Sequence, residues 1–138
     1  WLIDPSIIRK AQVQRWLATW SLPPAIESGS VAEAGMLMAK HDPLHVDAVL
    51  CGRDLPDGDG IHLLPRIRSA LDPAVRLGLL APKSALPTPA ECRASTMDAW
   101  ISKPLLPTAL LQFLLADTSL RNSTGRSAGT RTGSTFSR

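Results

Sequence analysis

Residues 47–60 read DAVLCGRDLPDGDG, an apolar run followed by a loop that is rich in Asp and Gly. The apolar and β-branched segment 46–52 predicts a strand that is buried on both faces of a sheet. In a parallel sheet, the functional crevice lies beyond the carboxyl ends of such strands. This strand ends in Gly52, which has no side chain. Either the site lies elsewhere, or a catalytic fold has lost its catalysis here.

Apolar runs and amphipathic stretches alternate on both sides of this segment. Strands are predicted at residues 2–3, 23–29, 46–52, 75–81 and 99–102. Helices are predicted at residues 5–20, 30–41, 60–71, 88–96 and 107–117. Five strands that alternate with five helices indicate an α/β fold, with a parallel sheet covered by helices on both faces. The residues at the carboxyl ends of four of these strands are Asp4, Gly52, Ala81 and Lys103.

Several residues mark the starts of the predicted helices. Pro5 stands near the start of the first helix. Ser30 is predicted to cap the second helix, with Glu33 three residues further on. Asp59 is predicted to cap the third helix, and Pro65 inside that helix should kink or shorten it.

Composition and charge narrow the class of protein. With 138 residues, of which 44% are hydrophobic and 20% charged, the chain suits one globular domain. No apolar run approaches the roughly 20 residues of a membrane span, and residues 1–5 do not suggest a secretory signal. Before residue 117, eleven basic residues stand against eleven acidic ones, so the net charge of +3 lies in the C-terminal stretch. We therefore expect no nucleic-acid-binding face and no membrane contact.

The cysteines and histidines do not predict a metal centre. Cys51 and Cys92 lack the spacing of metal ligands, and we interpret both as reduced thiols of a cytosolic domain. His41, His45 and His62 are scattered over different predicted elements, which is typical of surface histidines. We expect no metal site built from these residue types.

Residues 117–138 differ in composition from the rest of the chain, because Ser, Thr, Gly and Arg dominate them. Such a stretch has little apolar surface to bury. We therefore expect a domain at residues 1–116, followed by a flexible tail or linker. Truncation at Asp117 should change the Tm, measured by circular dichroism, by no more than a few degrees. A larger fall would mean that the tail packs against the domain.

Two longer stretches carry a resemblance to a known family. DAVLCGRDLPDGDGIHLLPRIR, residues 47–68, resembles the third strand, Pro-containing loop and third helix of response-regulator receiver domains. LLAPKSALPTPAECRASTMDAWISKPL, residues 79–105, resembles the part of these domains that ends in Lys-Pro after the fifth strand. The resemblance covers about residues 1–116. It implies a flavodoxin-like, doubly wound fold with five helices and five parallel strands in the order 2-1-3-4-5.

The resemblance also implies where a phosphoryl group would be accepted. In active receivers an aspartate at the end of the third strand accepts it as an acyl phosphate. Counting back four residues from Pro56 places this position at Gly52. Glycine offers no nucleophile, so the acceptor is missing.

The groups that assist the acceptor in the family are partly missing too. Two acids after the first strand help to hold Mg²⁺ in active receivers, and this chain has Ile3 and Asp4. A Ser or Thr ends the fourth strand there, and this chain has Ala81, or Leu80 in a register shifted by one residue. The lysine that pairs with the phosphate is retained as Lys103. We therefore predict a degenerate receiver that is not an enzyme and binds Mg²⁺ weakly or not at all.

Two retained residues have structural interpretations. Without an acceptor carboxylate, Lys103 is predicted to pair with Asp4 across the pocket as a structural cation. Trp100, where the family often has a switching aromatic, is interpreted as an apolar anchor on the outer face with its indole N–H near water.

The predicted function is that of an interaction module. We expect a phosphorylation-independent pseudo-receiver in a bacterial two-component signalling protein, most simply a hybrid sensor histidine kinase, on the cytoplasmic side of the membrane. Its partner would be the kinase core, another domain of the parent protein or a cognate regulator. The family commonly uses the fourth helix, fifth strand and fifth helix for partners. The candidate partner residues are Glu91, Arg93, Trp100, Leu106 and Leu110.

Two alternatives stay open at the level of sequence. Asp54 or Asp57 would make the domain a working phosphoacceptor, although turn chemistry favours Asp at such loop positions in any case. Arg53 followed by Asp54 would offer a donor beside an acceptor to a nucleotide second messenger. A DNA-binding regulator is disfavoured, because no helix-turn-helix pattern follows the receiver-like part.

Overall fold

A computed structural model gives the structure of the chain and describes residues 1–40 and 45–116. Its main sheet contains β1 (Leu2–Ile3), β2 (Glu27–Ser28), β3 (Ala48–Gly52), β6 (Arg76–Ala81) and β7 (Ala99–Ser102). The helices are α1 (Ile7–Thr19), α2 (Val31–Met38), α3 (Gly60–Ala70), α4 (Pro89–Ser95) and α5 (Pro107–Leu115). The remaining described elements are a hairpin of β4 (Asp54–Leu55) and β5 (Gly58–Asp59), and the short 3-10 helix η1 (Lys83–Ala85).

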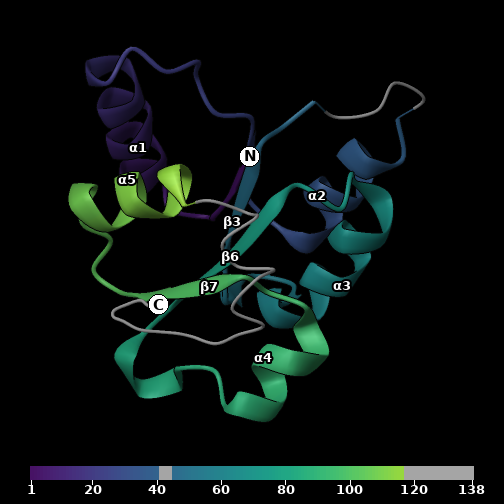
Figure 1. The fold of residues 1–138 in the computed structure, drawn as a ribbon. Helices are drawn as coiled ribbons and strands as arrows, with labels where there is room; N and C mark the ends of the chain where they lie inside the picture. The colour runs from purple at the N-terminus through teal and green to yellow at the C-terminus, as the bar shows by residue number, and fades with distance from the viewer. Residues whose placement is uncertain (41–44, 117–138) are drawn as a thin grey trace.

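The five strands of the main sheet are parallel and run in the order β2-β1-β3-β6-β7. Because β6 and β7 are the fourth and fifth strands of this sheet along the chain, this is the predicted order 2-1-3-4-5. Figure 1 shows α1 and α5 on one side of the sheet and α2 and α3 on the other. The predicted doubly wound α/β fold is therefore confirmed.

The core has two halves, one on each face of the sheet. All five residues of β3 are buried, and their side chains alternate between the two halves. Val49 and Cys51 pack in the cluster that includes side chains of α2 and α3. Leu50 packs in the cluster with Val13 of α1 and Phe113 of α5. The central strand is thus covered on both faces, as its uninterrupted apolar run predicts.

The predicted helix caps at Ser30 and Asp59 are confirmed. The Ser30 hydroxyl accepts a hydrogen bond from the N–H of Glu33 at 3.1 Å, and the Asp59 carboxylate accepts one from the N–H of Ile61 at 2.9 Å. The first helix begins at Ile7, two residues later than the predicted start at Pro5, because the Ser6 hydroxyl accepts from the N–H of Arg9 and serves as its cap. Short polar side chains set all three helix starts.

Three sequence-based expectations differ from the structure. Of the kink or shortening expected at Pro65, the shortening is wrong, because α3 continues to Ala70 and buries Ile67 in the core beyond the proline, and the kink stays a prediction. The second strand is only two residues long, within the predicted segment 23–29. The β4–β5 hairpin was not predicted at all. His41 and the predicted tail lie outside the described residues.

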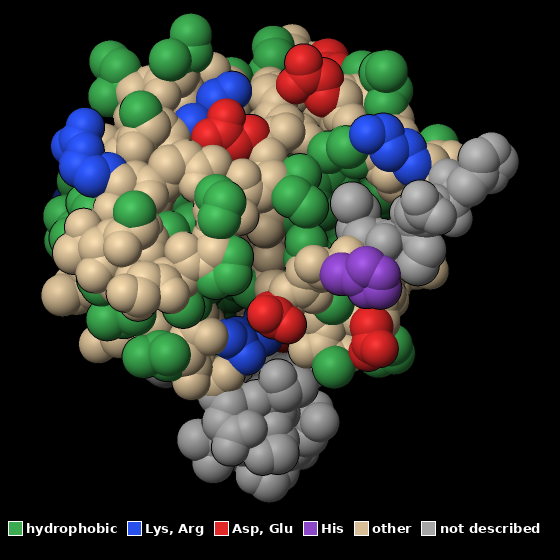
Figure 2. Space-filling view, turned by 90° about the horizontal axis from the view of Figure 1, so that it is seen from above, with side chains coloured by type: hydrophobic (Ala, Val, Ile, Leu, Met, Phe, Trp, Pro, Cys, Tyr) green, Lys and Arg blue, Asp and Glu red, His purple; other side chains and the backbone are tan. Residues whose placement is uncertain are grey.

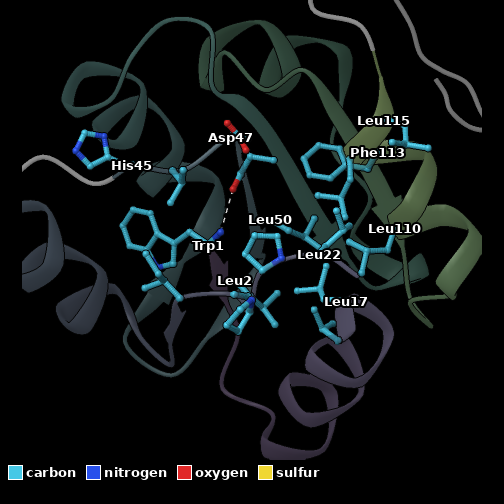
Figure 3. A pocket seen from close by; sticks show the side chains of 18 residues that line it. Trp1, Leu2, Leu17, Leu22, His45, Asp47, Leu50, Leu110, Phe113 and Leu115 are labelled. Carbon is cyan, nitrogen blue, oxygen red and sulfur yellow. Dashed lines mark hydrogen bonds between the residues drawn. The ribbon is translucent and has the colours of Figure 1, made fainter. Parts of the chain in front are cut away.

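The edge of the sheet at the amino ends of the strands carries an apolar cavity of about 290 Å³ between α1 and α5. Figure 2 views the molecule from this side, with hydrophobic side chains around a hollow near its centre. Leu17 of α1 and Leu110 and Phe113 of α5 are among the side chains that line it (Figure 3). The cavity lies at the opposite edge of the sheet from Asp4, Gly52 and the other strand-end residues.

Candidate functional site

The parallel sheet brings the four predicted strand-end residues to one edge. Asp4 follows β1, Gly52 ends β3, Ala81 ends β6 and Lys103 follows β7. The register pairs Gly52 with Leu80 and Ala81 with Ser102. Gly52 contributes no side chain and Ala81 is fully buried, so Asp4 and Lys103 are the two members of this set with polar side chains.

Asp4 is buried, with 1% of its surface exposed, and its carboxylate has two partners. One oxygen accepts a hydrogen bond from the N–H of Ser6 at 2.8 Å, and the other accepts from the Arg9 guanidinium at 2.7 Å. Arg9 stands in the first turn of α1, so the local chain itself brings the cation to the acid. Burying a carboxylate costs free energy unless it has such hydrogen-bonding and charged partners. The positive charge that balances Asp4 therefore comes from Arg9 of the same chain.

Lys103 pairs with Asp54 rather than with Asp4, so the predicted Lys103–Asp4 pair is wrong. Its Nζ lies 3.8 Å from Asp54 Oδ2, and the Asp54 side chain is 63% exposed. Asp54 reaches Lys103 because it is the first residue of the unpredicted hairpin. Exposed pairs at this distance contribute about 0–1 kcal/mol. Lys103 therefore adds little to the stability of the edge.

Arg53 makes several polar contacts at this edge, whereas the sequence suggests for it only a nucleotide-binding role. Its side chain is 13% exposed and lies between the end of β3 and α4. The guanidinium donates to Glu91 Oε2 at 2.7 Å, to the carbonyl of Ala85 at 3.1 Å and to Asp59 Oδ2 at 3.2 Å. Because the guanidinium donors are directed at acceptors of the protein itself, the structure gives no support to nucleotide binding by Arg53 and Asp54.

The pKa values of the Arg53 pair follow from this contact. The hydrogen bond from Arg53 is the main cause that holds the pKa of Glu91 below its ordinary value. The same hydrogen bond raises the pKa of Arg53. Both groups are therefore charged at neutral pH, and their hydrogen bonds are of the stronger, charge-assisted kind.

Asp57 caps a helix from a distance in sequence. Its two carboxylate oxygens accept hydrogen bonds from the N–H groups of Val31 at 2.7 Å and Ala32 at 2.9 Å, at the start of α2. These backbone hydrogen bonds lower the pKa of Asp57. Turn chemistry alone does not predict this contact, because it joins residues 25 or more positions apart. Asp57 is thus occupied as a structural cap, which weakens its case as a phosphoacceptor.

Cys51, next to the acceptor position, does not replace the missing aspartate. Its side chain is fully buried, and burial raises the pKa of its thiol to about 12. Only a thiolate is a competent nucleophile. Cys51 therefore behaves as a core residue, and both Cys51 and Cys92 are free thiols, as predicted.

The structure divides the predicted partner residues into exposed and buried ones. Arg93 is exposed, Leu106 is 54% exposed, and Glu91 and Trp100 are half-buried. Trp100 packs against the core half that contains α2 and α3. Leu110 is only 3% exposed and points into the apolar cavity (Figure 3), so its assignment to a partner surface is wrong. The reason is that α5 turns this position towards α1 and the sheet.

Comparison with known structures identifies the fold. A CheY-like receiver domain protein from Methanospirillum hungatei matches with a TM-score of 0.73 over 90% of this chain and 95% of that one, at 17% identity. The CheX–CheY complex with BeF3 and Mg²⁺ from Borrelia burgdorferi matches with a TM-score of 0.68 over 83% and 84%, at 22% identity. This chain has the receiver fold. None of the protein-family profiles and none of the curated proteins matches it.

Other solved proteins with the receiver fold are recorded with bound ions. A response regulator from Burkholderia pseudomallei, with a phosphorylated aspartic acid, a calcium ion and citrate, matches with a TM-score of 0.69 at 15% identity, over 88% of this chain and 69% of that one. At such identities the likeness establishes the fold alone.

Within residues 1–40 and 45–116, no helix is long and apolar enough to cross a membrane.

The edge of this chain does not suit the cations found with the receiver fold. Asp4 is already neutralised by Arg9, and Gly52 supplies no oxygen ligand from a side chain. The described residues contain no group of three or more His, Cys, Asp or Glu that could hold a metal ion. Mg²⁺ needs several oxygen ligands in near-octahedral geometry. No metal-dependent step follows from these residues.

We expect Mg²⁺ to bind this domain with a Kd weaker than about 1 mM. Of the two positions at the end of β1 that hold acids in active receivers, one is Ile3, and the carboxylate at the other, Asp4, is already paired with Arg9. Isothermal titration calorimetry measures the affinity, and backbone NMR shifts locate any contact. A sub-millimolar Kd, with shifts centred on Asp4 and Asp54, would contradict this expectation.

Proposed function

We propose that this chain is a phosphorylation-independent receiver domain that works as a protein-interaction module in two-component signalling. It would belong to a larger signalling protein, most simply a hybrid sensor histidine kinase, and act on the cytoplasmic side of the membrane. The observation that carries this proposal is the altered strand-end set. Gly52 stands at the acceptor position, and Asp4 is paired with Arg9 at 2.7 Å. The domain itself would catalyse no reaction.

The other acids near Gly52 support the same proposal, because each has a structural partner. Asp57 caps α2, Asp59 caps α3 and contacts Arg53, and Asp54 faces Lys103. A phosphoacceptor must be held in line with the incoming phosphoryl group. Moving any of these carboxylates into such a position would break the contact that it now makes.

The proposed partner surface consists of α4, β7 and the start of α5. Arg93 and Leu106 are its exposed members, and Trp100 of β7 is half-buried and packs against the core. Aromatic and arginine side chains are enriched among the residues that dominate binding energy in protein interfaces. The kinase core of the parent protein is the partner that we propose to test first.

Two measurements test the proposal. Incubation with a small phosphodonor and Mg²⁺ should give no acyl phosphate, and the affinity for the kinase core should be the same with and without the donor. Leu106→Asp should weaken that affinity by about tenfold. Met36→Asp, at a 71% exposed position on α2, is the matched control and should leave it unchanged. A phosphorylated aspartate in the wild-type chain, or a Kd that falls on addition of the donor, would overturn the proposal.

A further inference from the structure

Arg53 connects three separate segments of the carboxyl edge. Its main chain belongs to the β3–α3 connection, where its N–H donates to the carbonyl of Leu80 and its carbonyl accepts from the N–H of Gly60, both at 2.8 Å. Its side chain reaches the last residue of η1 through the carbonyl of Ala85, and α4 through Glu91. The backbone of Arg53 is therefore fixed on both sides, while its guanidinium holds the segment that follows β6.

α4 packs against α3, but it buries little of its own side-chain surface. It is seven residues long, and helices this short are marginal on their own in water. Ser95 is its one buried residue, so the helix contributes little apolar surface to the core. Polar contacts therefore contribute more to the position of α4 than they do for a helix with a buried apolar face.

Glu91 fixes both the start of α4 and its connection to Arg53. Its Oε1 accepts from the N–H of Thr88 at 2.9 Å, and the Thr88 hydroxyl accepts from the N–H of Glu91 at 3.1 Å, which completes a capping box. Both carboxylate oxygens also face the two terminal nitrogens of Arg53, at 2.7 and 3.3 Å. This two-pronged contact restrains the rotation of α4 as well as its distance from β3.

We propose that Arg53 is a positioning residue that holds η1 and α4 in one arrangement, so that the partner surface is preset without any phosphoryl group. This inference rests on the proposed function, because it names the residue that fixes the same surface. Arg53 follows the acceptor position directly in sequence. The residue next to the missing acceptor thus restrains the helix that carries part of the partner surface.

Amide hydrogen exchange in the full chain tests this inference. Arg53→Met removes the guanidinium and keeps the apolar stem and the backbone contacts. The amides of α4 and η1 should then exchange about tenfold faster, the equivalent of losing one charged hydrogen bond. The amides of α1 should not change. Arg93→Met is the matched control, because Arg93 is an exposed arginine of α4, and it should leave the exchange of α4 as in wild type.

A second, more conservative variant tests the inference in case Arg53→Met does not fold. Arg53→Lys keeps a charge but cannot form the two-pronged contact, so exchange of α4 should lie between wild type and Arg53→Met. Unchanged exchange of α4 in both variants would overturn the inference. Labelling of the wild-type chain by a phosphodonor would overturn the proposed function instead. The two failures are distinguishable, because the exchange measurement involves neither a phosphodonor nor a partner.

Discussion

Gly52→Asp is expected to accept phosphoryl groups at least about a hundredfold more slowly than the triple variant Arg9→Ala, Gly52→Asp, Ala81→Thr. The single substitution supplies the nucleophile at the end of β3 and nothing else. A Cβ at position 52 lies 3.3 Å from the carbonyl oxygen of Ile3, so a side chain enters after a small adjustment. Space is thus not what keeps the single variant slow.

The single variant should be slow because the Asp4 carboxylate lies beside the new aspartate and because contacts to the phosphoryl group are missing. The same Cβ lies 4.0 Å from Asp4 Oδ2, so the new carboxylate shares its site with one that is already paired with Arg9. Two carboxylates in one site raise the pKa of one of them. Arg9→Ala removes the guanidinium so that Mg²⁺ can take its place as the cationic partner of the buried Asp4, and Ala81→Thr supplies the hydroxyl that is missing at the end of β6. Each preorganised contact of this kind is worth roughly 3 kcal/mol, or a hundredfold or more in rate.

The comparison uses small-phosphodonor labelling followed by mass spectrometry of all three chains. The wild-type chain is the negative control and should stay unlabelled. Ile3 is left unchanged in the triple variant, because it is fully buried and an aspartate there would place a charge in the core. If the single variant labels as fast as the triple, the pocket is one substitution from activity, and Arg9 does not block it.

The fold follows from the sequence because its signals are local and repeated. The run around β3 has no polar residue between Ala48 and Gly52, and turn or cap residues such as Ser30 and Asp59 stand where the helices start. Burial on both faces of a strand and capping of a helix are each decided within a few residues. The strand order then follows from the parallel topology and the resemblance.

The contacts of the site did not follow, because they join distant residues. Arg53 and Glu91 are 38 positions apart, and Asp57 and Val31 are 26 apart. Neighbours in sequence show neither contact, so sequence alone predicts a partner-surface residue at Glu91 and an ordinary turn residue at Asp57. The capping box of Thr88 and Glu91 was the one local signal available, since it has the spacing of that motif. It would have placed Glu91 at the start of α4, beside the edge.

Gly60→Ala is expected to lower the free energy of unfolding by about 3 kcal/mol or more. A Cβ at this position would lie 1.9 Å from the carbonyl oxygen of Gly52 and 2.9 Å from Cys51 Sγ. The first of these is a backbone atom at the end of the central strand. It cannot move without opening the junction of β3 and α3. For a domain of this size, such a loss should lower the Tm by more than about 10 °C.

Gly35→Ala is the matched control within the same chain. Gly35 lies inside α2, and a Cβ there would come 3.3 Å from Arg66 Nη2, the far end of a flexible side chain. Alanine in a helix interior should therefore raise the free energy of unfolding by about 0.5–1 kcal/mol. Urea unfolding followed by circular dichroism measures both variants. A Gly60→Ala chain within 1 kcal/mol of wild type would show that the junction opens easily. Because the N–H of Gly60 holds the carbonyl of Arg53, an easily opened junction would also remove the fixed base from which Arg53 holds α4.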